Sequence, residues 1–97
     1  MSDPMDSIEA HTVLSEQLLP YRGEGYTALQ RLLAEGDIFE IRGPSGAAYR
    51  LQIEAVWDDR PGGTLRVFGL LEDGEGLGAF APVTGEFTIA STGAIIG

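Results

Sequence analysis

The first third of the chain carries apolar residues at helical spacing. Over residues 3–19 the members of this stripe are Met5, Ile8, Leu14 and Leu18. Asp3 is a favourable N-cap residue, and Pro4 stands at a first-turn position where its missing N–H costs nothing. Because proline interrupts the hydrogen bonds of a helix, we expect this first helix to end before Pro20.

A second, shorter helix is predicted over residues 27–35. Its apolar residues share one face and are Tyr26, Leu29, Leu32 and Leu33. Thr27 and Gln30 have the spacing of a capping box, and Gly36 suits the C-terminal end. A helix of about nine residues is marginal alone, so we expect it to pack against another element.

From residue 37 onward the period of the apolar positions changes to two. The predicted strands are 38–42, 48–57, 64–71 and 85–91. The second strand alternates most clearly, with Tyr49, Leu51, Ile53, Ala55 and Trp57 on one side and Arg50, Gln52 and Glu54 on the other. Turn-forming residues at 43–46 and 58–63 indicate that successive strands are joined by short connections.

The predicted pairing of the strands follows from their apolar sides. Leu65, Val67 and Leu71 are expected to face Ala55, Ile53 and Leu51, and Phe87 and Ile89 are expected to point inward. Residues 72–78 are expected to form an acidic, glycine-rich loop. Residues 79–83 are either part of the connection or a short fifth strand at the sheet edge, limited by Pro82.

Helices followed by strands, without βαβ alternation, indicate an α+β fold. We predict one domain, residues 1–97, in which two N-terminal helices pack on one face of an antiparallel meander sheet. The sheet has four strands, or five if residues 79–83 join it.

The second face of the predicted sheet is less polar than a solvated face. Its apolar members, Val56, Phe68 and Leu70, lie beside the charged residues Arg50, Glu54 and Arg66. These six residues are our candidate partner surface, because sizeable exposed apolar patches are uncommon on solitary monomers. Two alternatives stay open: the C-terminal tail with Ile95 and Ile96 covers this face, or a partner protein or second copy does.

The composition narrows the functional classes. Fifteen carboxylates and six arginines give a net charge of −9, and the chain has no lysine and no cysteine. A basic tract for nucleic acid or anionic lipid, a disulfide scaffold, a thiolate nucleophile and a cysteine-ligated metal are therefore excluded. Without a signal-peptide pattern or a membrane-length apolar run, we expect a cytoplasmic protein. Abundant Gly, Ala and Arg without Lys or Asn fit a GC-rich bacterial genome.

The negative charge is unevenly distributed. Residues 1–20 carry four acids and no base, residues 21–71 carry six arginines against seven acids, and residues 72–97 carry four acids and no base. An acidic inhibitor, of immunity or nucleic-acid-mimic type, would gather carboxylates on one surface to meet a basic partner. Whether the two acidic ends meet in space decides how well this alternative fits.

No motif assigns catalysis or a cofactor. His11 has Ser7 and Ser15 one turn away on either side, but a solvated helix face offers no oriented base or oxyanion donors. The glycines of residues 23–28 fit a dinucleotide-binding spacing but lack a preceding strand. Asp58 and Asp59 are separated from residues 72–75 by a whole strand, so we expect no shared metal site. We therefore predict a non-catalytic protein-binding or self-associating module, with the acidic inhibitor second and a small enzyme third.

Overall fold

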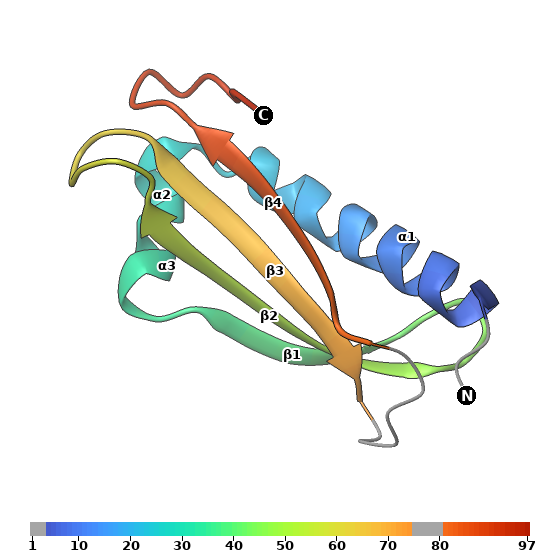
Figure 1. The fold of residues 1–97 in the computed structure, drawn as a ribbon. Coiled ribbons are helices and arrows are strands. Elements are labelled where there is room, and N and C mark those ends of the chain that lie inside the picture. The colour runs from blue at the N-terminus through green and yellow to red at the C-terminus, as the bar shows by residue number, and fades with distance from the viewer. Residues whose placement is uncertain (1–3, 75–80) are drawn as a thin grey trace.

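The computed structural model describes residues 4–74 and 81–97, with side chains from residue 8 onward. Its sheet is an antiparallel meander of order β1-β2-β3-β4, preceded by the helical segments (Figure 1). The strands are β1 (Asp37–Arg42), β2 (Ala48–Trp57), β3 (Leu65–Asp73) and β4 (Val83–Ile89). The α+β class and the four-stranded antiparallel sheet are thus confirmed.

One side of every strand builds the core. Tyr49, Leu51 and Ile53 are each at most 1% exposed, and the intervening residues of β2 are exposed or half-buried. The inward residues of the sheet form a single cluster with the apolar residues of the helices; its buried members are Ala10, Val13, Leu14, Leu18, Tyr21, Leu29, Leu32, Tyr49, Leu51, Ile53, Ala55, Leu65, Val67, Leu71, Val83, Phe87 and Ile89. The inward alternation predicted for β2, and for Phe87 and Ile89, is confirmed.

The first helix, α1 (Pro4–Arg22), continues through Pro20, so the prediction that it ends before this proline is wrong. Pro20 removes one hydrogen bond, that of its own missing N–H to the Glu16 carbonyl, and the helix ends two residues later. The backbone N–H of Gly23 donates to the Pro20 carbonyl at 3.1 Å and closes the helix. The last turn is also held by tertiary contacts, since Tyr21 is buried and the guanidinium of Arg22 lies 5.1 Å from the Phe87 ring centroid. The predicted N-cap Asp3 lies outside the described residues.

The buried stripe of α1 differs from the predicted one. Ala10, Val13, Leu14, Leu18 and Tyr21 face the core. Ile8 is 60% exposed, so its predicted membership of this stripe is wrong. Residues 10, 13, 14, 18 and 21 follow the helical period more closely than a stripe beginning at Ile8, and the second half of α1 therefore sets which face is buried.

The second predicted helix is two single turns, α2 (Tyr26–Leu29) and α3 (Arg31–Ala34). Its N-cap is Gly25, with φ of 92° and no side-chain capping bond, so the predicted Thr27–Gln30 capping box is wrong. The N–H groups of Gln30 and Leu33 donate to carbonyls three residues back, which tightens the chain and breaks the regular helix. Leu29 and Leu32 remain buried and carry the expected packing.

Two adjacent glycines bring α1 close to the sheet. Gly69 of β3 pairs with Gly85 of β4, and both are on the inward side of the sheet. A Cβ at Gly69 would lie 2.9 Å from Leu14 Cδ1, and one at Gly85 would lie 3.3 Å from Leu14 Cδ2 and from Leu18 Cδ1. The two leucines of α1 therefore pack directly over the glycine pair, a role that the alternation of apolar residues did not indicate.

The register between β2 and β3 is partly as predicted. Leu71 faces Leu51, as expected, whereas Val67 faces Ala55 and Leu65 faces Trp57. Ile53 lies opposite Gly69. The connection closes through the Asp58 N–H, which donates to the Thr64 carbonyl at 2.8 Å, and this bond makes Leu65 the partner of Trp57. The predicted facing of Leu65 with Ala55 and of Val67 with Ile53 is therefore wrong.

The C-terminal tail pairs with the outer edge of β4. The N–H of Thr88 donates to the Gly97 carbonyl at 2.9 Å, and the N–H of Ile96 donates to the Thr88 carbonyl at 2.8 Å. Ile95 and Ile96 are 39% and 61% exposed. Their backbone therefore protects a sheet edge, and the alternative in which this tail covers the second face is wrong.

The ends of the last strand also differ from the prediction. β4 begins at Val83, directly after Pro82, and ends at Ile89, two residues earlier than expected. Residues 81 and 82 are not in a strand, and residues 79 and 80 lie outside the described part, which thus contains no fifth strand. The predicted hairpin turn at 43–46 is confirmed, with Gly46 at φ of 88°.

Candidate functional site

The side of the sheet opposite the core is called here the open face. Its members are the outward residues of the four strands: Ile38, Glu40, Arg42, Ala48, Arg50, Gln52, Glu54, Val56, Arg66, Phe68, Leu70, Glu72, Thr84, Glu86 and Thr88. Because the helices share one core with the inward residues, the described part of the chain has no second layer here. Ile38 and Val56 are 61% and 45% exposed.

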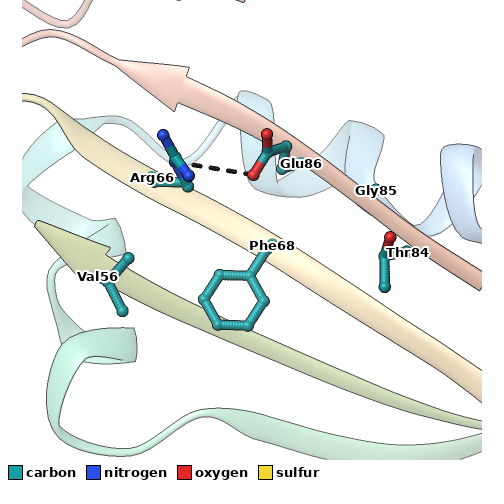
Figure 2. A pocket seen from close by; sticks show the side chains of 6 residues that line it. All are labelled: Val56, Arg66, Phe68, Thr84, Gly85 and Glu86. Atoms are coloured by element: carbon teal, nitrogen blue, oxygen red, sulfur yellow. Dashed lines mark ion pairs between the residues drawn. The ribbon is translucent and has the colours of Figure 1, made fainter. Parts of the chain in front are cut away.

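A shallow groove of about 650 Å³ runs over the open face across β2, β3 and β4. It is lined by Val56, Arg66, Phe68, Thr84, Gly85 and Glu86 (Figure 2). Figure 2 shows the Phe68 ring between Val56 and Thr84, with the Arg66 and Glu86 side chains along one side. The groove therefore combines an apolar floor with one charged side.

Neighbouring strands place charges on both sides of the central aromatic ring. Phe68 pairs with Glu54 of β2 and with Glu86 of β4. Arg66, two residues earlier on β3, pairs with Val56 and with Thr88. Residues directly opposite each other in adjacent strands have Cβ atoms about 5 Å apart, so the ring lies between two carboxylate side chains.

Arg66 makes the ion pairs of the groove. Its guanidinium donates to the Asp58 carboxylate, and its Nε lies 3.7 Å from Glu86 Oε2. The three side chains are 32% to 56% exposed, so these pairs contribute little to stability. Nε has no hydrogen-bond partner within the described chain.

The remaining charges on β2 are unpaired. Arg50 lies between Glu40 of β1 and Glu72 of β3, and Glu54 lies beside Phe68. Among the described residues, neither Arg50 nor Glu54 takes part in an ion pair or hydrogen bond. Both charges are exposed and are available to a partner.

All six residues of the predicted partner surface lie on the open face, but only three of them line the groove. Val56, Arg66 and Phe68 line the groove. Arg50, Glu54 and Leu70 are on the same face outside the groove lining.

Sequence reasoning missed the groove residues of β4, which are Thr84, Gly85 and Glu86, and the exposed Ile38 of β1. For Glu86 a signal was present: since Phe87 and Ile89 point inward, residues 86 and 88 point outward. The expected start of the strand at residue 85 left Thr84 out.

Polar contacts on the core side hold the helices to the sheet. The Tyr21 hydroxyl donates to Asp37 at 2.7 Å, and the Arg31 guanidinium donates to the same carboxylate at 3.0 Å and to Glu24 at 3.1 Å. The hydrogen bond from Tyr21 and the contact with Arg31 lower the pKa of Asp37, and burial and the same hydrogen bond raise the pKa of Tyr21. The geometry ties α1 and α3 to the start of β1.

A second polar contact joins the start of α1 to the β1–β2 turn. Glu9 Oε1 accepts hydrogen bonds from the Tyr49 hydroxyl at 2.7 Å and from Ser45 Oγ at 2.8 Å. These bonds, that of Tyr49 first, lower the pKa of Glu9. The carboxylate fits against Gly43, where an added Cβ would lie 2.3 Å from it. This acid is committed to holding the fold.

The other sequence candidates remain without a catalytic arrangement. His11 is exposed beside Thr12, Ser15 and Leu19 on the solvent side of α1, and the side chain of Ser7 lies outside the described set. Asp58 and Glu72 are near opposite ends of β3, and the described residues contain no group of three or more side chains suited to a metal ion.

Carboxylates of both acidic segments lie at one end of the molecule, with Glu9 on the core side of the sheet and Glu72 on the open face. Glu9 contacts Tyr49, and Tyr49 pairs with Asp73 at the end of β3, next to Glu72. The start of α1 and the end of β3 lie at the same end of the molecule (Figure 1). One end of the sheet is therefore rich in carboxylates, although Arg42 and Arg50 are also close to it.

Comparisons with protein-family models, with curated proteins and with solved structures found no match to this chain. No helix in the described part of the chain is long and apolar enough to cross a membrane.

Proposed function

We propose that this protein is a non-catalytic protein-binding module that binds through the open face of its sheet. The observation that carries the proposal is the groove at Val56, Phe68 and Arg66, on a sheet face that no other described element covers. Exposed apolar patches with a polar rim commonly mark interaction sites.

The chemistry of the groove favours a protein surface as the ligand. An aromatic residue and an arginine at the centre, with charged residues around them, is the composition typical of protein interfaces. The groove is open, whereas small-molecule sites are enclosed and cover most of their ligand. The matching element on a partner is an apolar side chain that inserts beside Phe68, with polar groups opposite Arg66 and Glu86.

The test compares capture of partners by the wild-type chain, a Phe68→Thr variant and a Leu19→Gln control. Threonine retains the strand preference and adds no third carboxylate between Glu54 and Glu86. Leu19 is 62% exposed on α1, so its replacement removes a comparable apolar side chain outside the open face. Captured proteins are quantified by mass spectrometry, and each binding protein is then titrated against the purified variants.

We expect at least one protein to bind the wild type and the Leu19→Gln control equally and to bind the Phe68→Thr variant at least tenfold more weakly. Self-association that depends on Phe68 also supports the proposal. Binding that is the same for all three chains would show that the open face is not the binding surface.

An acidic inhibitor is the second candidate, favoured by the carboxylates that lie at one end of the molecule near the β1–β2 turn. Its ligand would be a basic protein, and its affinity would fall steeply with salt because the contact is between charges. A salt titration together with Phe68→Thr separates the two candidates, because Glu72 itself is on the open face. Binding to a carboxylate surface falls with salt and is insensitive to Phe68→Thr, whereas binding in the groove is weakened by Phe68→Thr.

A further inference from the structure

The charges on the outward side of β2 reverse sign about the centre of the strand. Going along β2, the outward residues are Ala48, Arg50, Gln52, Glu54 and Val56. A small apolar residue, a cation and a neutral residue are followed by an anion and a second apolar residue. When a strand of this kind is laid over a copy of itself running in the opposite direction, each cation meets an anion.

The neighbouring strand repeats the arrangement. The outward residues of β3 are Arg66, Phe68, Leu70 and Glu72, with a cation at one end, an anion at the other and two apolar residues between them. Its centre lies at Gly69, one residue from the level of Gln52, because Gln52 pairs with Leu70. The charges of β2 are therefore complementary to their own reversed copy about Gln52, and those of β3 about Gly69, so a single two-fold axis pairs the charges of one of these strands.

We propose that the partner of the open face is a second copy of this chain, stacked face to face about a two-fold axis that crosses the strands at Gln52 and Leu70. This inference rests on the proposed function and names its partner. In the dimer, Leu70 meets Leu70 of the partner copy, Val56 meets Ala48 of the partner copy, and Phe68 lies opposite Glu72 of the partner copy. Glu54 of each copy meets Arg50 of the other, so the two charges that have no partner within the described chain become paired.

The charge of the open face fits this occupant. It carries four glutamates, namely Glu40, Glu54, Glu72 and Glu86, and the three arginines Arg42, Arg50 and Arg66, in a chain of net charge −9. Most of the excess negative charge is therefore elsewhere, and this nearly neutral face is a surface on which two strongly acidic copies can meet without large repulsion.

The size of the face sets the expected strength. Strands of six, ten, nine and seven residues, about 4.8 Å apart at about 3.3 Å per residue, give roughly 510 Å² per copy, near 1,000 Å² for both. Stable interfaces bury about 1,200–2,000 Å², so this dimer lies below that range, among weak and transient contacts. Sheets stacked face to face keep their strands within about 30° of each other, which leaves the central pairs in contact.

The test is sedimentation equilibrium of the wild-type chain over roughly 1 µM to 1 mM, with charge-reversed variants. Arg50→Glu places like charges together in the dimer, and so does Glu54→Arg. We expect each variant alone to self-associate at least about tenfold more weakly, because each dimer would then hold two contacts between like charges. An equimolar mixture of the two variants restores opposite charges at every β2 pair and should form a heterodimer as tight as the wild-type dimer.

Folding of each variant is checked by circular dichroism and denaturant unfolding. The new carboxylate of the Arg50→Glu variant would lie between Glu40 and Glu72 and could destabilise the fold by repulsion. Arg50→Gln therefore serves as a second variant that weakens the dimer without adding a carboxylate. A Leu19→Gln control on α1 should dimerise like the wild type.

Three outcomes overturn the proposal: a wild-type chain that stays monomeric to 1 mM, a dimer insensitive to Phe68→Thr, and a variant mixture no tighter than the separate variants. The first outcome leaves the proposed function intact if another protein is captured through Phe68. If no captured protein depends on Phe68 either, both proposals fail.

Discussion

The two faces of the sheet are built by the same four strands and differ in what they do. On the inward side, Leu51, Val67 and Leu71 are completely buried under the helices, and two glycines allow α1 to approach. On the open face, the alternate residues of the same strands are exposed or half-buried, and charged and apolar side chains are mixed. One face therefore stabilises the fold, and the other is available for binding.

This difference explains why open-face changes can be used to test function. A side chain that is already partly in water loses little hydrophobic free energy when it is shortened, whereas a buried one loses it in full and leaves a cavity. The two faces should respond very differently to the same substitution, and each of the following changes examines that contrast.

The largest effect is expected from Leu71→Ala, compared with Leu70→Ala on the same strand. Leu71 is 0% exposed, so its truncation should lower the free energy of unfolding by about 3 kcal/mol. Leu70 is half-buried on the open face, and its truncation should cost about 1 kcal/mol or less. Urea unfolding measures both. Equal losses would show that the open face is covered in solution.

The next effect is expected from Gly69→Val. Valine has the higher strand preference, but its Cβ would lie 2.9 Å from Leu14 Cδ1 and 3.0 Å from Ile53 Cδ1. Overpacking should therefore cost about 2 kcal/mol in the free energy of unfolding. Ala48→Val on the open face is the matched control and should change it by less than about 0.5 kcal/mol. A stabilised Gly69→Val chain would contradict the close approach of α1.

The strands of the fold were largely predictable because apolar and polar residues alternate along them and turn-forming residues separate them. Both signals depend only on residues close together in the sequence. The strand positions, the hairpin at 43–46 and the inward set of β2 followed from these local signals. The extension of α1 beyond Pro20 could not be predicted from local signals, because it depends on the contact of Arg22 with Phe87, which is far away in the sequence. The glycine pair was also missed, because a glycine has no side chain and so adds nothing to the apolar pattern.

The open face was predictable as a set of residues but not as a groove. Alternation alone put Val56, Phe68 and Leu70 on one side of the sheet. The contribution of Glu86, and the separation of Leu70 from the groove, depend on the register between β3 and β4. The position of the C-terminal tail depends on backbone hydrogen bonds with Thr88. The apolar character of Ile95 and Ile96 does not indicate such bonds.

A smaller effect, with a pH dependence, is expected from Tyr21→Phe on the core side. Loss of the hydroxyl that donates to Asp37 should cost about 1 kcal/mol at pH 7. Because the folded pKa of Asp37 lies below its ordinary value of 3.8, its stabilisation is fully present above about pH 5 and is lost as the pH falls through 3.8 and then through the folded pKa. The difference between wild type and variant should therefore shrink in acid.

The control for this pH dependence is Tyr26→Phe. The Tyr26 hydroxyl donates to the Gly63 carbonyl at 2.6 Å, an acceptor that does not titrate. Its loss should cost a similar free energy at neutral and acidic pH, measured by denaturant unfolding at both. A Tyr21→Phe cost that is unchanged in acid would show that Asp37 is not the group responsible.

The smallest effect is expected from Arg66→Met on the open face, compared with Arg31→Met on the core side. Methionine keeps most of the apolar stem, so each substitution mainly removes the guanidinium. The Arg66 pairs with Asp58 and Glu86 are exposed, and their loss should change the free energy of unfolding by less than about 0.5 kcal/mol. Arg31 is as exposed as Arg66, but it donates four hydrogen bonds to the carboxylates of Asp37 and Glu24, so its loss should cost more, up to about 1 kcal/mol. If Arg66→Met were the more destabilising change, the charges of the open face would serve the fold, and the separation of the two faces into stabilising and binding surfaces would be wrong.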